Sequence, residues 1–245
     1  MTIRLPHGLG RIKSKFDERD YNLKDFLPKG AFLKLVNEKV WEYPPEHMAL
    51  DQGNTAHCVG FSMANFGLNY PTHIDFTNDD GHKFYYQCKE IDGTPLNEDG
   101  STIRSAAKVL QKSGRIQGYA FAPDMPTIKW WLLNRGPMIV GTAWMRDMFI
   151  PDANNILHIT GDIVGGHAYL LNEWRIDNYI GIQNSWGNLW GKEGKAYISA
   201  EDFGKLFIYD GEAMTAVELD VYNQPSKECW LMDFFKRNKM MIKRN

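Results

Sequence analysis

The pattern of apolar residues changes at Gly136-Pro137, and this change limits the fold more than any other feature of the sequence. Before it, apolar residues recur at helical spacing. After it come short segments rich in β-forming residues, separated by turn residues, at 138–140, 168–171, 179–182 and 196–198. Helices that precede strands along a chain, rather than alternating with them, indicate an α+β protein with two lobes. The cleft between two lobes is a preferred place for a substrate.

Three helices are predicted in the first half. Residues 58–69 are apolar on every side, which is typical of a buried helix. Ser101 is the expected cap of a second helix, because apolar side chains follow it at helical spacing over 103–110. A third begins at Pro126 and ends before Gly136, since proline suits a first helical turn and glycine the position after the last.

These patterns divide the chain into three parts. Residues 1–45 form a charged arm without a sustained period. Residues 46–216 contain both patterns and form the domain, with a helical lobe at about 46–136 and a β lobe at about 137–216. Residues 217–245 form a C-terminal extension.

The extension predicts an amphipathic helix with a basic face. Residues 227–245 contain six basic and two acidic side chains around an apolar stripe. We hypothesise that this helix binds a protein partner, and packing on its own domain is the alternative. The formal net charge of −2 does not point to nucleic acid, and no run of 18 apolar residues points to residence in a membrane.

The cysteine content fits a reducing compartment. The chain has three cysteines, Cys58, Cys88 and Cys229, and such a low and odd number argues against a disulfide framework. Residues 1–10 lack the apolar stretch of a signal peptide, so a cytoplasmic protein is expected. A single cysteine is most often a buried structural thiol, and this is the expectation for Cys88 and Cys229.

Cys58 differs because a loop of small and turn-forming residues leads into it and a helix starts at it. The positive end of a helix stabilises a thiolate, which is the reactive form of cysteine. Gln52 lies six residues earlier on the loop, where its amide and the Cys58 backbone N–H would form a two-donor oxyanion hole. The alternative for Cys58 is a buried packing residue. The adjacent His57 points elsewhere on a helix, so we expect it to lie at the surface or to line a subsite.

A base for this thiol is expected at His167. It follows Gly165-Gly166 at the start of a predicted strand, where small residues let a substrate backbone come close. Asn184 follows 17 residues later and would orient the imidazole, while Trp186 would cover their hydrogen bond. Cys58 and His167 are predicted to form an ion pair that lowers the thiol pKa.

These pieces resemble one known family. Gln-Gly before a helix-starting cysteine, then Gly-His-Ala, then Asn-Ser-Trp-Gly-x-x-Trp-Gly at 184–191, is the order found in papain-like cysteine peptidases. The resemblance covers roughly residues 45–210 and implies a papain fold, with Cys58 on a helical left lobe and His167 and Asn184 on a β-barrel right lobe. It implies hydrolysis of protein or peptide substrates through a thioester on Cys58, without a metal or cofactor.

The resemblance also implies substrate contacts. It places Asp99, Gly100 and Ser101 in the segment that pairs with the substrate backbone, and Gly166 and Trp186 lie beside the site in the same motifs. A valine at 59, where many members have an aromatic residue, is similar to bacterial and phage members. For a phage protein, association with the virion is a further possible location.

Two departures from the family pattern remain. Cys58 and His167 are 109 residues apart, less than the family's ~130, which implies trimmed surface loops. With 51 residues before Gln52, the family's long helical inhibitory prosegment is not expected. Two other functions stay open, a papain-fold structural or binding protein such as a phage virion component, and a cysteine amidase or cell-wall peptidase.

Overall fold

The structure is a computed structural model that describes residues 6–33, 38–41 and 48–219. The predicted C-terminal helix and Cys229 lie outside these residues. No helix in the described ranges has the length and apolar character that crossing a membrane requires.

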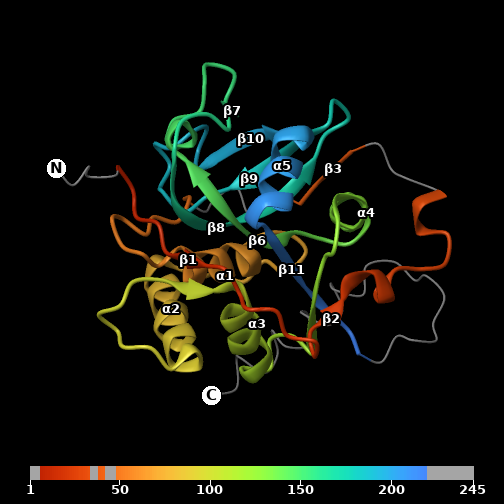
Figure 1. Cartoon of the computed structure of the whole chain (residues 1–245), viewed down its shortest axis with the longest axis horizontal. Helices are drawn as coiled ribbons and strands as arrows, with labels where there is room; N and C mark the ends of the chain where they lie inside the picture. The colour runs from red at the N-terminus through yellow and green to blue at the C-terminus, as the bar shows by residue number, and fades with distance from the viewer. Residues whose placement is uncertain (1–5, 34–37, 42–47, 220–245) are drawn as a thin grey trace.

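The helical lobe contains α1 (Cys58–Leu68), α2 (Asn78–Asp92) and α3 (Ile103–Lys112) (Figure 1). Every residue of α1 is buried, as its apolar sequence predicts. The cap of α3 is Thr102 and not Ser101, because the Thr102 side chain accepts from the Ser105 backbone N–H. The Ser101 hydroxyl donates instead to Asp92.

The rest of the described structure is built around one mixed β-sheet, with two helices packed against it. Its strands follow the order β2-β5-β11-β6-β8-β9-β10-β7, with β3 paired to β8. The path is open at β2 and β7 over the described residues, so the sheet is not the closed barrel that the resemblance implied. The bounds are β2 Tyr21–Asn22, β3 Lys39–Val40, β5 Gly118–Phe121, α4 Met125–Asn134, β6 Met138–Met145, β7 Ile156–Leu157, β8 Ile163–Trp174, β9 Tyr179–Gln183, β10 Lys195–Ser199, α5 Ala200–Asp210 and β11 Glu212–Val217.

Two hydrophobic cores meet along β8. Tyr169 and Leu171 belong to the core on the sheet side, whereas Ala168 and Leu170 belong to the core of the helical lobe. Successive side chains of a strand point to opposite faces, so β8 is a wall shared by both lobes. The tryptophans of α4 pack into the sheet-side core, although the sequence pattern grouped this helix with the helical lobe.

The N-terminal arm runs between the two lobes (Figure 1). Strand β1 (Arg11–Ile12) pairs in parallel with β4 (Ser101–Thr102), and β2 pairs in parallel with β5. The sequence indicated an irregular arm because no period is visible within it. Its order comes from pairing with segments about 90 residues away in the chain, which leaves no local pattern.

Candidate active site

Cys58 lies at the first position of α1 and is fully buried at the boundary between the lobes. Its sulfur contacts the backbone of Ala168, Gly10 and Val59, which hydrogen bond to it. Ala168 directly follows His167 on β8, so the histidine lies one residue along the strand from a backbone contact of the thiol. The helix start and the strand predicted from the sequence therefore meet at this point.

Burial dominates the protonation of this pair. Desolvation raises the pKa of the Cys58 thiol to about 11, and the three backbone hydrogen bonds oppose this shift. Desolvation also lowers the pKa of His167 to about 3, against the hydrogen bond that His167 donates to Asn184. Burial thus disfavours the charged form of each group in the covered site and opposes the ion pair that the sequence predicted, which stays a prediction.

Asn184 determines which nitrogen of His167 carries the proton. Its Oδ1 accepts the Ser185 backbone N–H at 2.8 Å, which identifies this atom as the oxygen of the amide. The same Oδ1 lies 2.8 Å from His167 Nε2, so Nε2 must be the donor. Nδ1 of the neutral ring is then an unprotonated acceptor, and this buried atom has no hydrogen-bond partner within the described structure.

Aromatic rings enclose the imidazole. Trp186 lies nearly parallel to His167, with ring centroids 4.6 Å apart, and Trp144 meets its edge at 4.8 Å. His7 of the arm also stacks on Trp186, with ring centroids 4.5 Å apart. Trp186 therefore stacks on the ring of His167, and its predicted role of covering the hydrogen bond to Asn184 stays a prediction.

Gln52 is held in one orientation by its neighbours. Its Oε1 accepts from the Ser185 hydroxyl at 2.7 Å, so Nε2 faces the opposite way. Nε2 donates to Thr55 O at 2.7 Å and to Gly8 O at 3.1 Å. A backbone carbonyl of the arm therefore occupies the donor that the sequence assigned to the oxyanion.

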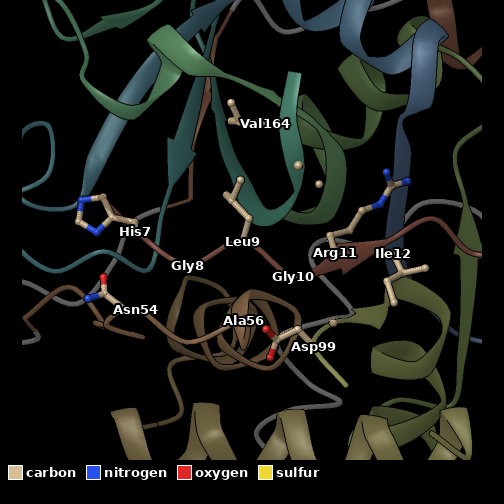
Figure 2. Close-up of a pocket in the computed structure, with 13 residues that line it drawn as sticks. His7, Gly8, Leu9, Gly10, Arg11, Ile12, Asn54, Ala56, Asp99 and Val164 are labelled. Carbon is tan, nitrogen blue, oxygen red and sulfur yellow. The ribbon is translucent and has the colours of Figure 1, made fainter. Parts of the chain in front are cut away.

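Residues 7–12 of the arm, here called the cleft segment, lie within the cleft between the lobes. Figure 2 shows them running between Val164 on one wall and Asn54, Ala56 and Asp99 on the other. The cavity along this path has a volume of ≈ 510 Å³. The fit is close, because a Cβ on Gly10 would lie 2.0 Å from Ala56 O.

The residues predicted to contact a substrate backbone contact the cleft segment instead. Gly10 donates to Gly166 O at 3.1 Å, and Ser101 donates to Gly10 O at 2.9 Å. Gly100 has φ +99°, which favours glycine, and a Cβ on it would lie 2.9 Å from Gly10 O. Asp99 lines the cavity. The structure thus brings these four predicted positions and Trp186 together around one extended peptide.

His57 and Cys88 lie outside this constellation. His57 is partly buried against Tyr85 at a ring distance of 3.8 Å, and its Nδ1 lies 2.7 Å from Nδ1 of His82. Burial, with a smaller contribution from the nearby His82, lowers the pKa of His57 to about 4. Cys88 is fully buried with its sulfur 3.6 Å from that of Met63, in agreement with an inert thiol.

Sequence reasoning missed the arm and the acidic residues that hold it. His7, Gly8 and Arg11 reach the site, and Asp210 and Glu212 bind the Arg11 guanidinium. A usable signal was present in the glycines at positions 8 and 10, since alternating glycines on an extended segment permit close backbone approach on one face. Ser185 belongs to the Asn-Ser-Trp-Gly motif, but the sequence predicted no role for it. In the structure its backbone N–H identifies the oxygen of Asn184.

Known proteins that resemble this chain in sequence are cysteine proteinases. No protein-family model matches the chain. The cathepsin B-like cysteine proteinases 6 and 5 of Caenorhabditis elegans are 32% identical over 79 residues and 30% identical over 112 residues. These matches cover 31% and 43% of this chain but only 21% and 33% of the two relatives, so the shared region is a minor part of each relative.

Solved structures extend the likeness to most of the chain. Xylellain, a cysteine protease from Xylella fastidiosa, has a TM-score of 0.67 at 20% identity and covers 89% of this chain and 99% of its own. Procathepsin B S9 from Trypanosoma congolense has a TM-score of 0.60 at 14% identity, with 86% of both chains covered. The chain therefore has the fold of papain-like cysteine proteases, including a bacterial one, as its motifs predicted.

Proposed function

We propose that this chain is a cysteine peptidase that hydrolyses peptide bonds through a thioester on Cys58. The observation that supports this best is the hydrogen-bond arrangement from Ser185 through Asn184 to His167. It leaves Nδ1 of the imidazole as a bare acceptor on the residue before Ala168, whose backbone contacts the Cys58 sulfur. A base that is oriented by a third group beside a nucleophile is the arrangement that acyl transfer requires.

The proposed steps follow from these groups. His167 takes the thiol proton, and the Cys58 thiolate attacks the carbonyl carbon of the peptide. Gln52 Nε2 and the Cys58 backbone N–H donate to the oxyanion. The protonated His167 then gives its proton to the leaving amine as the carbon–nitrogen bond breaks. Water that loses a proton to His167 attacks the thioester, releases the acid product and restores the thiol.

We further infer that the described form of this peptidase is closed. The Gly8 carbonyl accepts from Gln52 Nε2, so an added substrate cannot use this donor until the cleft segment leaves. The same segment helps to bury the Cys58 sulfur through the contact at Gly10, and burial keeps the thiol neutral. Hydrolysis therefore requires displacement of residues 7–12. This closure is reached by an extended segment, with no α-helix among residues 6–33.

Labelling with an epoxide inhibitor of thiol peptidases tests the assignment. We expect one adduct on the wild-type chain, located on Cys58 by peptide mass mapping. Cys58→Ala should give no adduct, whereas the matched variant Cys88→Ala should react like the wild type because Cys88 is enclosed in the core.

Equal labelling of Cys58→Ala and wild type would contradict the assignment of the nucleophile. Gly10→Val provides an opened chain for the same assay, since its side chain does not fit against Ala56. If neither wild type nor Gly10→Val reacts or hydrolyses any peptide, the alternative of a papain-fold binding protein is favoured.

A further inference from the structure

A buried lysine lies behind the segment that pairs with the arm. Lys89, in the last turn of α2, is 1% exposed. Its Nζ donates to Glu98 O at 2.8 Å and to Gly100 O at 3.1 Å, which are its hydrogen-bond partners in the described structure. The negative end of a helix favours a cation in its last turn. Removal of an ammonium from water still costs free energy that an apolar side chain would not, so packing alone does not account for this lysine.

Three side chains on one face of α2 bind the same segment. Tyr85, Lys89 and Asp92 follow one another at spacings of four and three residues, which places them on one side of the helix. The Tyr85 hydroxyl accepts the Gly100 backbone N–H at 2.9 Å, and Asp92 accepts the Ser101 hydroxyl at 2.6 Å. Both backbone polar groups of Gly100 are thus bonded to side chains of α2, which hold this glycine at its positive φ.

The peptide group between Gly100 and Ser101 connects Lys89 to the cleft. In a trans peptide the carbonyl and the N–H point in opposite directions. Lys89 binds the carbonyl of this group, while its N–H, that of Ser101, donates to Gly10 O at 2.9 Å. The ammonium therefore fixes the plane in which the N–H points into the cleft. A charged donor on the carbonyl also polarises the amide, which makes the N–H a stronger donor.

We propose that Lys89 is a positioning residue for the substrate. It orients and polarises the Ser101 N–H, which donates to a backbone carbonyl of an extended peptide once the cleft segment has left. In the closed form this donor is occupied by Gly10 O, so a substrate in the same place binds the same N–H. This inference rests on the proposed peptidase function and adds to it a residue that acts through one peptide group.

The first test compares two substrates of different length in the Gly10→Val background. One is an extended peptide amide, and the other is p-nitrophenyl acetate, whose acetyl group is too short to reach Ser101. Lys89→Met keeps a long side chain without the ammonium. We expect it to lower kcat/KM for the peptide by about 10- to 100-fold, as for a hydrogen bond to a charged group, and to leave the ester unchanged. The matched variant Lys83→Met, on the exposed side of α2, should change neither value.

A second variant covers the case in which Lys89→Met does not fold. Tyr85→Phe keeps the buried ring and removes the acceptor of the Gly100 N–H. We expect it to lower kcat/KM for the peptide by about 2- to 10-fold, as for a neutral hydrogen bond, again without an effect on the ester. Equal effects on peptide and ester, or none on either, would overturn the proposal.

The second test does not need catalysis. Amide hydrogen exchange is followed by NMR in Cys58→Ala, where the cleft segment itself is the bound peptide. We expect Lys89→Met to speed exchange of the Ser101 N–H by about 10- to 100-fold. The amides paired between β6 and β8 should exchange at their former rates, because they do not depend on this segment.

The two tests separate the role of Lys89 from the peptidase. Unchanged exchange at Ser101, or equal acceleration at Ser101 and in the β6–β8 pairing, would overturn the positioning role. Hydrolysis of both substrates that Lys89→Met does not alter would overturn it too and leave the peptidase. Faster exchange confined to the segment, in a chain whose Gly10→Val parent hydrolyses neither substrate, would support the positioning of a bound peptide and overturn the peptidase.

Discussion

At the scale of single residues, Asn184 acts on the proposed chemistry through one oxygen atom. This oxygen accepts both the Ser185 backbone N–H and His167 Nε2. Its loss removes the reason for Nε2 to carry the proton and frees the ring to rotate, but leaves thiol and imidazole in place. The role we propose for Asn184 is therefore to position the base and select its tautomer.

We expect Asn184→Ala to retain residual peptide hydrolysis, with kcat reduced on the order of 100-fold, within the range that general acid–base catalysis contributes. Cys58→Ala should retain none, since it cannot form the thioester. Both are measured as kcat on a peptide amide in the Gly10→Val background, with circular dichroism as the control for folding. Two equally inactive, folded variants would contradict the positioning role of Asn184.

His167 also connects stability to pH. Its pKa is lowered by burial from an ordinary value of 6.5 to about 3 in the folded chain. Between these values the unfolded chain binds a proton that the folded chain does not, so stability present above pH 6.5 is lost as pH falls toward 3. Each pKa unit corresponds to about 1.4 kcal/mol, so the loss at pH 4 is on the order of 3 kcal/mol.

We therefore expect the free energy of unfolding to fall between pH 7 and pH 4 by more in the wild type than in His167→Gln. Urea titration at each pH measures both. Because all other titrating groups are shared, the difference between the two chains reports His167. Parallel pH profiles would show that the imidazole takes up its proton inside the folded cleft.

Motif reasoning proposed candidate residues for this site but could not predict how deeply the cleft segment buries them. Cys58, His167, Asn184 and Gln52 were identified because each stands in a short local pattern. The predicted ion pair stays a prediction, and the burial that opposes it includes a contact of Cys58 with Gly10, 48 residues earlier in the chain. No local pattern reports such a distant contact.

At the scale of elements, the successes and failures have a common cause. Helix α1 was predicted because all its residues are apolar, whereas α2 was missed because polar residues dominate it. Its ends carry standard signals, a capping box between Thr77 and Asp80 and a left-handed Gly93. The sequence predicted elements that are marked by a run of buried apolar residues. It did not predict elements that are marked mainly by their end signals or by distant partners, such as β1.

The cleft segment belongs to this second kind, and it makes a testable prediction. Gly10→Val should displace the segment, because a side chain there collides with the backbone of Ala56. Steric conflicts in well-packed sites cost about 1–3 kcal/mol, so we expect hydrolysis of an added peptide amide to rise about 5- to 150-fold.

The control for this experiment is Lys15→Ala, an exposed arm position outside the cleft segment, whose activity should equal that of the wild type. Limited proteolysis should cut the arm faster in Gly10→Val than in the control. Faster cleavage of the arm without a rise in activity would mean that the cleft segment does not restrain the enzyme.

At the scale of the whole molecule, two cores share one wall, and the site lies where they meet. The two-lobe arrangement could be predicted from the change of pattern at Gly136-Pro137. The openness of the sheet could not, because strand order depends on pairings between distant segments, such as β11 between β5 and β6. The proposed partner-binding helix at 227–245 lies outside the described residues, and as a docking element it would belong to neither core.

Deletion of residues 227–245 should therefore leave peptide hydrolysis unchanged and shift Tm by less than about 2 °C, which corresponds to under ~1 kcal/mol for a chain of this size. Differential scanning calorimetry and the peptide assay measure the two quantities. A large drop in Tm with loss of activity would show that the helix packs on its own domain.

The position of the cleft segment in the chain also affects how the protein is made. Residues 7–12 leave the ribosome before Cys58, and His167 follows 155 residues after Ile12. At 5–20 residues per second, the segment precedes the histidine by roughly 8 to 30 s. The proposed nucleophile and base thus first meet in the presence of the peptide that covers them. In the proposed closed form, the newly completed site would therefore be covered before it could act on other proteins.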